Sequence, residues 1–131
     1  METRIGPHRI TVEEDVVTAY VSSSWLLAEI TEFLQLCTAT RERLGSVYLI
    51  TVVSDGYLLP PDSRKYIGEW SRSNVVSGNV VAGAPFAMRV LIGIVSRASK
   101  MIGAKATEVE FTATEAEARA WVAQRKLSHR H

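Results

Sequence analysis

Serine, aspartate and histidine are the residues of this chain that could support hydrolysis, and one short segment brings the first two together. Ser54-Asp55 opens the stretch "SDGYLLPPDSRKY", which follows the apolar, β-branched run "SVYLITVV". Functional groups of α/β enzymes often lie in a turn that follows a buried strand. A nucleophilic serine also needs a base, and an acid that orients the base. The chemistry to consider is therefore hydrolysis with Ser54 as the nucleophile.

The histidines give little support for such a base. His8 falls in the opening strand pattern, and His129 and His131 stand near the end of the chain. The sequence has no G-x-S-x-G elbow, P-loop or G-x-G-x-x-G motif. Asp55-Gly56 is typical of a turn. We therefore expect a protein that is not an enzyme and needs no cofactor.

Metal ligands are also sparse. His129 and His131 are two residues apart, and no cysteine or carboxylate cluster accompanies them at the spacing of a metal site. Cys37 is the only cysteine, so no internal disulfide can form. We expect no metal centre, and a single reduced thiol fits a cytoplasmic location.

Length and composition indicate one globular domain spanning residues 1–131. The chain is 47% hydrophobic and 22% charged, and its net charge of +1 provides no general attraction for nucleic acid. Met1 to Ile10 is too polar for a signal peptide. The most apolar stretch, 80–95, is interrupted by Pro85 and Arg89 and is shorter than the ~20 residues of a membrane-spanning helix.

Hydrophobic periodicity predicts alternating strands and helices. Pro61 suits the first position of a helix, Gly45 suits a helix end, and Glu117 follows Thr114 at the spacing of a capping box. The predicted strands are 5–14, 16–22, 46–53, 79–83 and 107–112. The predicted helices are 25–44, 61–73, 85–101 and one from residue 114, with 126–131 as a frayed tail.

This order, ββαβαβαβα, predicts an α/β fold: an N-terminal β-hairpin followed by βα repeats, in a mixed, mostly parallel sheet with helices packed on it. Trp70 and Trp121 are expected in its core, whereas Trp25 follows three serines and is a candidate contact residue. The residues expected in the core of the sheet are Val47, Leu49, Val52, Val80, Val81, Val109 and Phe111.

Four stretches, "IGPHRITVEE", "LLPPDSRKYIGEW", "GAPFAMRVL" and "FTATEAEARAW", carry a resemblance to a known family. They resemble the STAS fold of anti-sigma-factor antagonists, and more closely the small bacterial stand-alone STAS/SEC14-domain, or SpoIIAA-like, proteins. The resemblance covers nearly the whole chain. Because its motifs are mostly structural, it implies a fold more directly than an activity.

The resemblance also implies a phosphorylation switch. In the antagonists the second helix begins with Asp-Ser-Ser-Gly, and a partner kinase phosphorylates its serine, which breaks the partner complex. Asp62-Ser63 is similar to the first half of this motif, whereas Arg64 and Lys65 replace the second serine and the glycine. Ser63 and Ser54 are the candidate phosphosites.

The third predicted helix is unusually apolar, since Arg89 is the only charge in "FAMRVLIGIV". Three interpretations are open: a helix buried on two sides, a surface for a partner or a second copy, and the wall of a lipid pocket. We expect a regulatory or adaptor domain that binds a protein or itself, the alternative being a carrier or sensor of an apolar small molecule. The candidate contact residues are Phe86, Met88, Arg89, Leu91, Ile92 and Val95.

Overall fold

The computed structural model describes residues 1–54, 59–90, 93–94 and 109–129. Six strands form one sheet in the order β1-β2-β3-β4-β5-β6. They are β1 (Glu2–Ile5), β2 (His8–Glu13), β3 (Val16–Val21), β4 (Tyr48–Val53), β5 (Gly78–Ala82) and β6 (Val109–Thr112). The first two pairings are antiparallel and the last three are parallel. The predicted α/β class, with an N-terminal hairpin and later parallel strands, is confirmed.

The sheet has one strand more than predicted, because the segment read as a single strand over 5–14 contains a turn. The chain reverses at Gly6, whose φ is +59°, and β1 then pairs with β2 from Ile5 opposite His8. A Cβ at residue 6 would also overlap the Glu29 carboxylate. A left-handed conformation and close approach of a side chain both favour glycine there.

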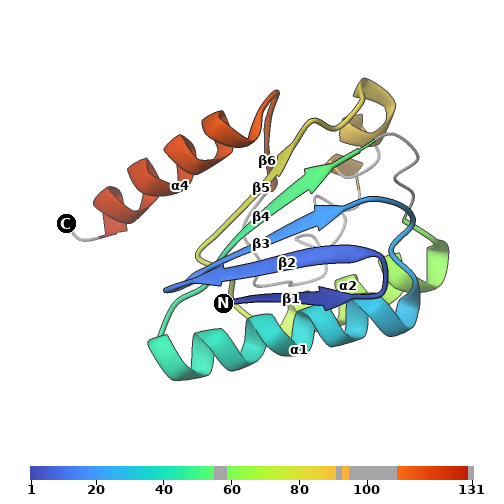
Figure 1. Cartoon of the computed structure of the whole chain (residues 1–131), viewed down its shortest axis with the longest axis horizontal. Coiled ribbons are helices and arrows are strands. Elements are labelled where there is room, and N and C mark those ends of the chain that lie inside the picture. The colour runs from blue at the N-terminus through green and yellow to red at the C-terminus, as the bar shows by residue number, and fades with distance from the viewer. Residues whose placement is uncertain (55–58, 91–92, 95–108, 130–131) are drawn as a thin grey trace.

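Two helices cover one face of the sheet and a third covers the other (Figure 1). α1 (Leu27–Leu44) and α2 (Pro61–Ser73) lie together on the first face, and α4 (Glu115–His129) lies on the second, over β4, β5 and β6. Residues 86–90 and 93–94 are also helical. Gly45 ends α1 with φ of 85°, and Pro61 is the first residue of α2, as predicted.

Each face of the sheet has its own apolar core. Under α1 and α2, the side chains of β2, β3 and β4 meet Ile30, Phe33 and Leu34. Under α4, Ile50 and Val80 meet Ala118 and Val122. Of the predicted core residues, Val47, Leu49, Val80 and Val81 are buried, and Val52, Val109 and Phe111 are partly buried.

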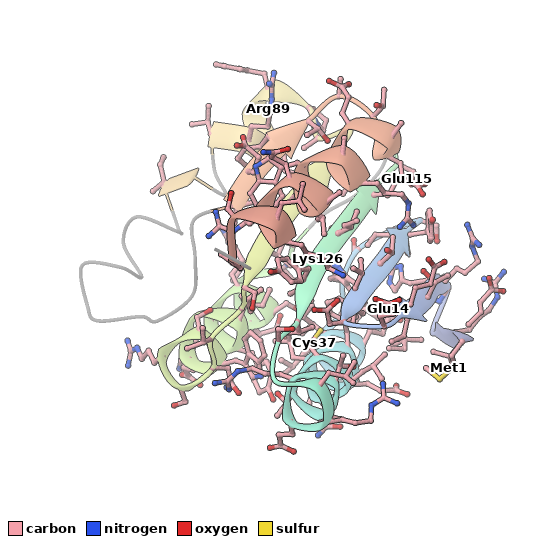
Figure 2. The ribbon with its side chains drawn as sticks, turned by 90° about the vertical axis from the view of Figure 1, so that its left-hand side faces the viewer. Met1, Glu14, Cys37, Arg89, Glu115 and Lys126 are labelled. Atoms are coloured by element: carbon pink, nitrogen blue, oxygen red, sulfur yellow. The ribbon has the colours of Figure 1, made fainter. Side chains whose placement is uncertain are left out.

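The C-terminal helix begins as predicted and ends later. Its start is capped by Thr114, whose hydroxyl accepts the Glu117 N–H at 3.2 Å. A frayed tail from residue 126 is wrong for 126–129, which belong to α4. Lys126 forms an ion pair with Asp15 at 2.5 Å, and His129 Nδ1 lies 2.7 Å from the Tyr48 hydroxyl. Figure 2 shows Lys126 on the side of α4 that faces the sheet.

Candidate functional site

Ser54, the candidate nucleophile, stands at the carboxyl end of β4. Its side chain is exposed, and both its N–H and its hydroxyl donate to the Val21 carbonyl, at 3.2 and 3.0 Å. These bonds join the ends of two neighbouring parallel strands. The rest of the turn, 55–58, lies outside the described residues, and so does the predicted Asp55-Gly56 turn.

Of the histidines that the structure describes, His8 is the one near this edge of the sheet, and it is fully buried with partners at both ring nitrogens. Nδ1 accepts the Ser22 N–H at 3.3 Å, and Nε2 lies 3.0 Å from Glu29 Oε1. Because Nδ1 is the acceptor, the proton is on Nε2, which donates to Glu29. Both nitrogens of this imidazole therefore make structural contacts inside the chain.

The Glu29 carboxylate connects the histidine to the start of α1. Its Oε1 also accepts the Leu26 N–H at 3.1 Å, which satisfies one of the amide groups that a helix start leaves without a partner. The Trp25 ring lies 4.3 Å from the His8 ring and 5.2 Å from the Phe33 ring. Trp25 is only 2% exposed, so its assignment as a contact residue is wrong.

The two candidate phosphosites differ in access. Ser63 has no exposed surface, and its hydroxyl donates to the Trp25 carbonyl at 2.7 Å. A phosphoryl group has no room there unless the start of α2 first moves away from the segment before α1. In this conformation only the Ser54 hydroxyl is near solvent.

The helical segment after β5 presents large apolar side chains to solvent. Phe86, Val90 and Ile94 are 72%, 43% and 52% exposed, and we refer to these three residues as the apolar stripe. Phe86 and Val90 belong to the helical residues 86–90 and are four residues apart, the separation that puts two side chains on one side of a helix, and Ile94 belongs to the helical residues 93–94. Val90 and Ile94 were not among the predicted contact residues, although their spacing from Phe86 is visible in the sequence.

The predicted contact residues in this segment have different environments. Phe86 and Arg89 are exposed, and Figure 2 shows Arg89 at the same end of the molecule as Glu115. Met88 is partly buried and packs against the core under α1 and α2. Leu91, Ile92 and Val95 lie outside the described residues.

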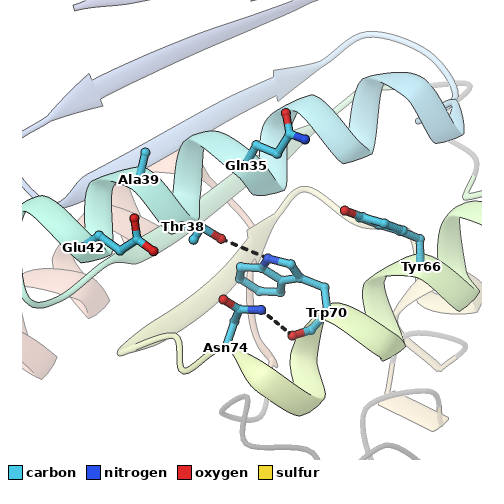
Figure 3. A pocket seen from close by; sticks show the side chains of 7 residues that line it. All are labelled: Gln35, Thr38, Ala39, Glu42, Tyr66, Trp70 and Asn74. Carbon is cyan, nitrogen blue, oxygen red and sulfur yellow. Dashed lines mark hydrogen bonds between the residues drawn. The ribbon is translucent and has the colours of Figure 1, made fainter.

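A groove of about 340 Å³ runs between α1 and α2 (Figure 3). Trp70, expected in the core, is only partly buried and borders this groove, and its indole Nε1–H donates to Thr38 Oγ1 at 3.1 Å. The small side chains of Thr38 and Ala39 leave space beside the indole. The residues lining the groove are Gln35, Thr38, Ala39, Glu42, Tyr66, Trp70 and Asn74.

Paired charges join α4 to the polar side of β3. The Tyr20 hydroxyl and Arg119 Nε both donate to Glu115 Oε2 at 2.8 Å. Hydrogen bonding to Arg119 lowers the pKa of Glu115 despite partial burial, and the same bond raises the pKa of Arg119. The Arg9 guanidinium lies 3.9 Å from the Tyr20 ring centre. Because each charge has a partner, this surface is not an open anion site.

Cys37 is buried in the core beneath α1, and burial raises the pKa of its thiol far above the usual range. Such a thiol does not react as a thiolate at neutral pH. In the part of the chain that the structure describes, no three histidine, cysteine, aspartate or glutamate side chains gather as a metal site requires. Across residues 1–54, 59–90, 93–94 and 109–129, no helix has the length and apolar character to cross a membrane.

Comparisons with protein-family models, curated proteins and solved structures found no match to this chain. The candidate contact site is therefore identified from the structure alone. It is the apolar stripe, and the neighbouring Met88 packs against the core under α1 and α2.

Proposed function

We propose that this protein is a non-enzymatic regulatory or adaptor domain that binds another protein surface through the apolar stripe. The exposure of Phe86, Val90 and Ile94 is the observation that carries the proposal. Burying such a side chain fully is worth ~1.5–3 kcal/mol. A partner that covers all three would therefore gain apolar burial that the single chain leaves unused.

A protein surface fits the stripe better than an uncharged apolar ligand does, because a charge borders it. The Arg89 guanidinium lies 5.8 Å from the centre of the Phe86 ring and is exposed. Protein interfaces combine an apolar centre with a polar rim, and arginine is enriched in them. A lipid tail would leave this guanidinium without a matching group.

The contacts of His8 support a non-enzymatic role. Its unprotonated nitrogen, Nδ1, already accepts the Ser22 N–H, so the ring would have to leave that partner to act as a base for Ser54. The regulatory part of the proposal comes from the resemblance to the STAS proteins. Burial of Ser63 favours control by binding over phosphorylation at that residue.

A pair of matched substitutions tests the proposal. Val90→Glu places a charge in the stripe, and Val75→Glu places one at a valine outside it with nearly equal exposure, 40% against 43%. Sedimentation velocity reports self-association, and affinity purification followed by mass spectrometry identifies other bound proteins. We expect Val90→Glu to lose the complex that wild type and Val75→Glu form. Equal behaviour of the two variants would contradict the proposal.

A further inference from the structure

The groove between α1 and α2 offers hydrogen-bond acceptors and no positive charge. Its only ionisable side chains are Glu42 and Tyr66. Among the residues that the structure describes, the side chains of Gln35, Glu42 and Tyr66 have no hydrogen-bond or ion-pair partner. Asn74 Nδ2 donates to the Trp70 carbonyl at 2.8 Å, which leaves the Asn74 amide oxygen free to accept. The groove is therefore complementary to a cationic group rich in donors.

The Trp70 indole offers such a cationic group an aromatic surface in a fixed position. Its bond to Thr38 holds the ring between α1 and α2, and Figure 3 shows the ring between Glu42 and Asn74 on one side and Tyr66 on the other. Tyr66 precedes Trp70 by four residues on α2, so the two aromatic side chains are neighbours on one helix face. A flat cation can lie on such a ring and be attracted by its π face.

We propose that this groove binds an arginine side chain of a partner protein. A guanidinium is planar, carries five N–H donors and stacks on aromatic rings, so it can lie on Trp70 while donating to Glu42 and to the Gln35 or Asn74 amide oxygen. A lysine ammonium cannot stack in this way. A quaternary ammonium group has no donors for these acceptors.

The occupant is a protein side chain because the groove is open. Gln35, Ala39 and Glu42 along its α1 side are exposed, and Trp70 is only partly buried. Small free ligands usually bind in sites that enclose most of their surface. An arginine within a polypeptide gains additional contacts along α1 and α2 outside the groove. This inference is independent of the apolar stripe, so Val90→Glu should leave arginine binding unchanged.

The test uses nuclear magnetic resonance of the whole chain, with the peptide acetyl-Ala-Arg-Ala-amide as the probe. The Trp70 indole N–H signal is assigned by its loss in Trp70→Phe. We expect a saturable shift of this signal and of the Gln35 and Asn74 side-chain amides. The Trp25 and Trp121 indole signals should stay in place.

Matched controls make the result specific. Glu42→Gln should weaken binding about three- to fivefold, the size expected for an exposed ion pair. Glu32→Gln, which changes another exposed carboxylate of α1 outside the groove, should not. The lysine peptide should bind more weakly than the arginine peptide. Equal binding of the two peptides, no effect of Glu42→Gln, or no saturable shift would overturn the proposal. Methylguanidinium binding as tightly as the peptide would contradict a protein occupant.

Discussion

The imidazole of His8 has no exposed surface, and its two nitrogens face partners from different parts of the chain. In the sequence this histidine was one of three candidate bases. Its burial could not be read from spacing, because it depends on the turn at Gly6 and on Glu29, twenty-one residues away. The sequence contains no catalytic motif around His8, and its pattern did not reveal this structural role.

Replacing His8 tests that role. His8→Phe removes the acceptor of the Ser22 N–H and the donor to Glu29, and it leaves polar groups without partners inside the protein. We expect the free energy of unfolding to fall by about 1–3 kcal/mol. Glu29→Gln keeps an oxygen that can accept from His8 and Leu26, so its loss should be smaller. Urea denaturation measures both. A larger loss of unfolding free energy for Glu29→Gln than for His8→Phe would contradict the assignment of the proton to Nε2.

At the scale of the element, α4 shows which parts of a helix the sequence predicts. Its start was predicted, because the cap is a local contact between Thr114 and Glu117. Its end was placed too early, because Lys126 and His129 are held by Asp15 and Tyr48, which are distant in sequence. The groove was missed for a similar reason, since it exists only where α1 and α2 pack together.

The cap of α4 is open to a direct test. Thr114→Ala removes the hydroxyl that accepts the Glu117 N–H, and we expect the free energy of unfolding to decrease by about 1 kcal/mol. Thr114→Ser retains a hydroxyl and should be close to wild type. Thermal unfolding followed by circular dichroism compares the two. A Thr114→Ala protein as stable as wild type would show that the cap contributes nothing measurable.

At the scale of the whole molecule, Asp15 links the turn between β2 and β3 to β4 and α4. Burial opposes its ionisation, but hydrogen bonds from Lys126 and Ser46 outweigh that effect, so the pKa of Asp15 lies below its usual range. The carboxylate therefore stabilises the fold above about pH 4, its unfolded pKa. This stabilisation is lost as the pH falls through the lower, folded pKa.

An acid titration of stability checks this contribution. Below about pH 4 the unfolded chain binds the Asp15 proton before the folded chain does, so stability should decrease as the pH falls. Asp15→Asn removes the titrating group, and its stability should change less between pH 6 and pH 3 than that of wild type. Urea midpoints at each pH provide the measurement. If the stability of wild type and of Asp15→Asn changed equally with pH, the lowered pKa assigned to Asp15 would be contradicted.

The alternation of strands and helices was sufficient to predict the α/β class, because each βα unit has a local pattern of period two or 3.6. The same pattern singled out the segment after β5 as too apolar for an ordinary surface helix. It did not identify which side chains face outward. That depends on how Met88 packs against the core, which in turn leaves Phe86, Val90 and Ile94 exposed.

Photo-crosslinking inside cells tests the central claim most directly. Val90 is replaced by p-benzoylphenylalanine, the same replacement is made as a control at Leu127, an exposed residue of α4 outside both the stripe and the groove, and the cells are irradiated. A benzophenone bonds only to what touches it, so the covering molecule is identified in place. We predict a crosslinked product at position 90 that is heavier by the mass of a protein, a second copy or another chain, and absent at position 127. A small apolar adduct at position 90, or the same products from both positions, would contradict the claim.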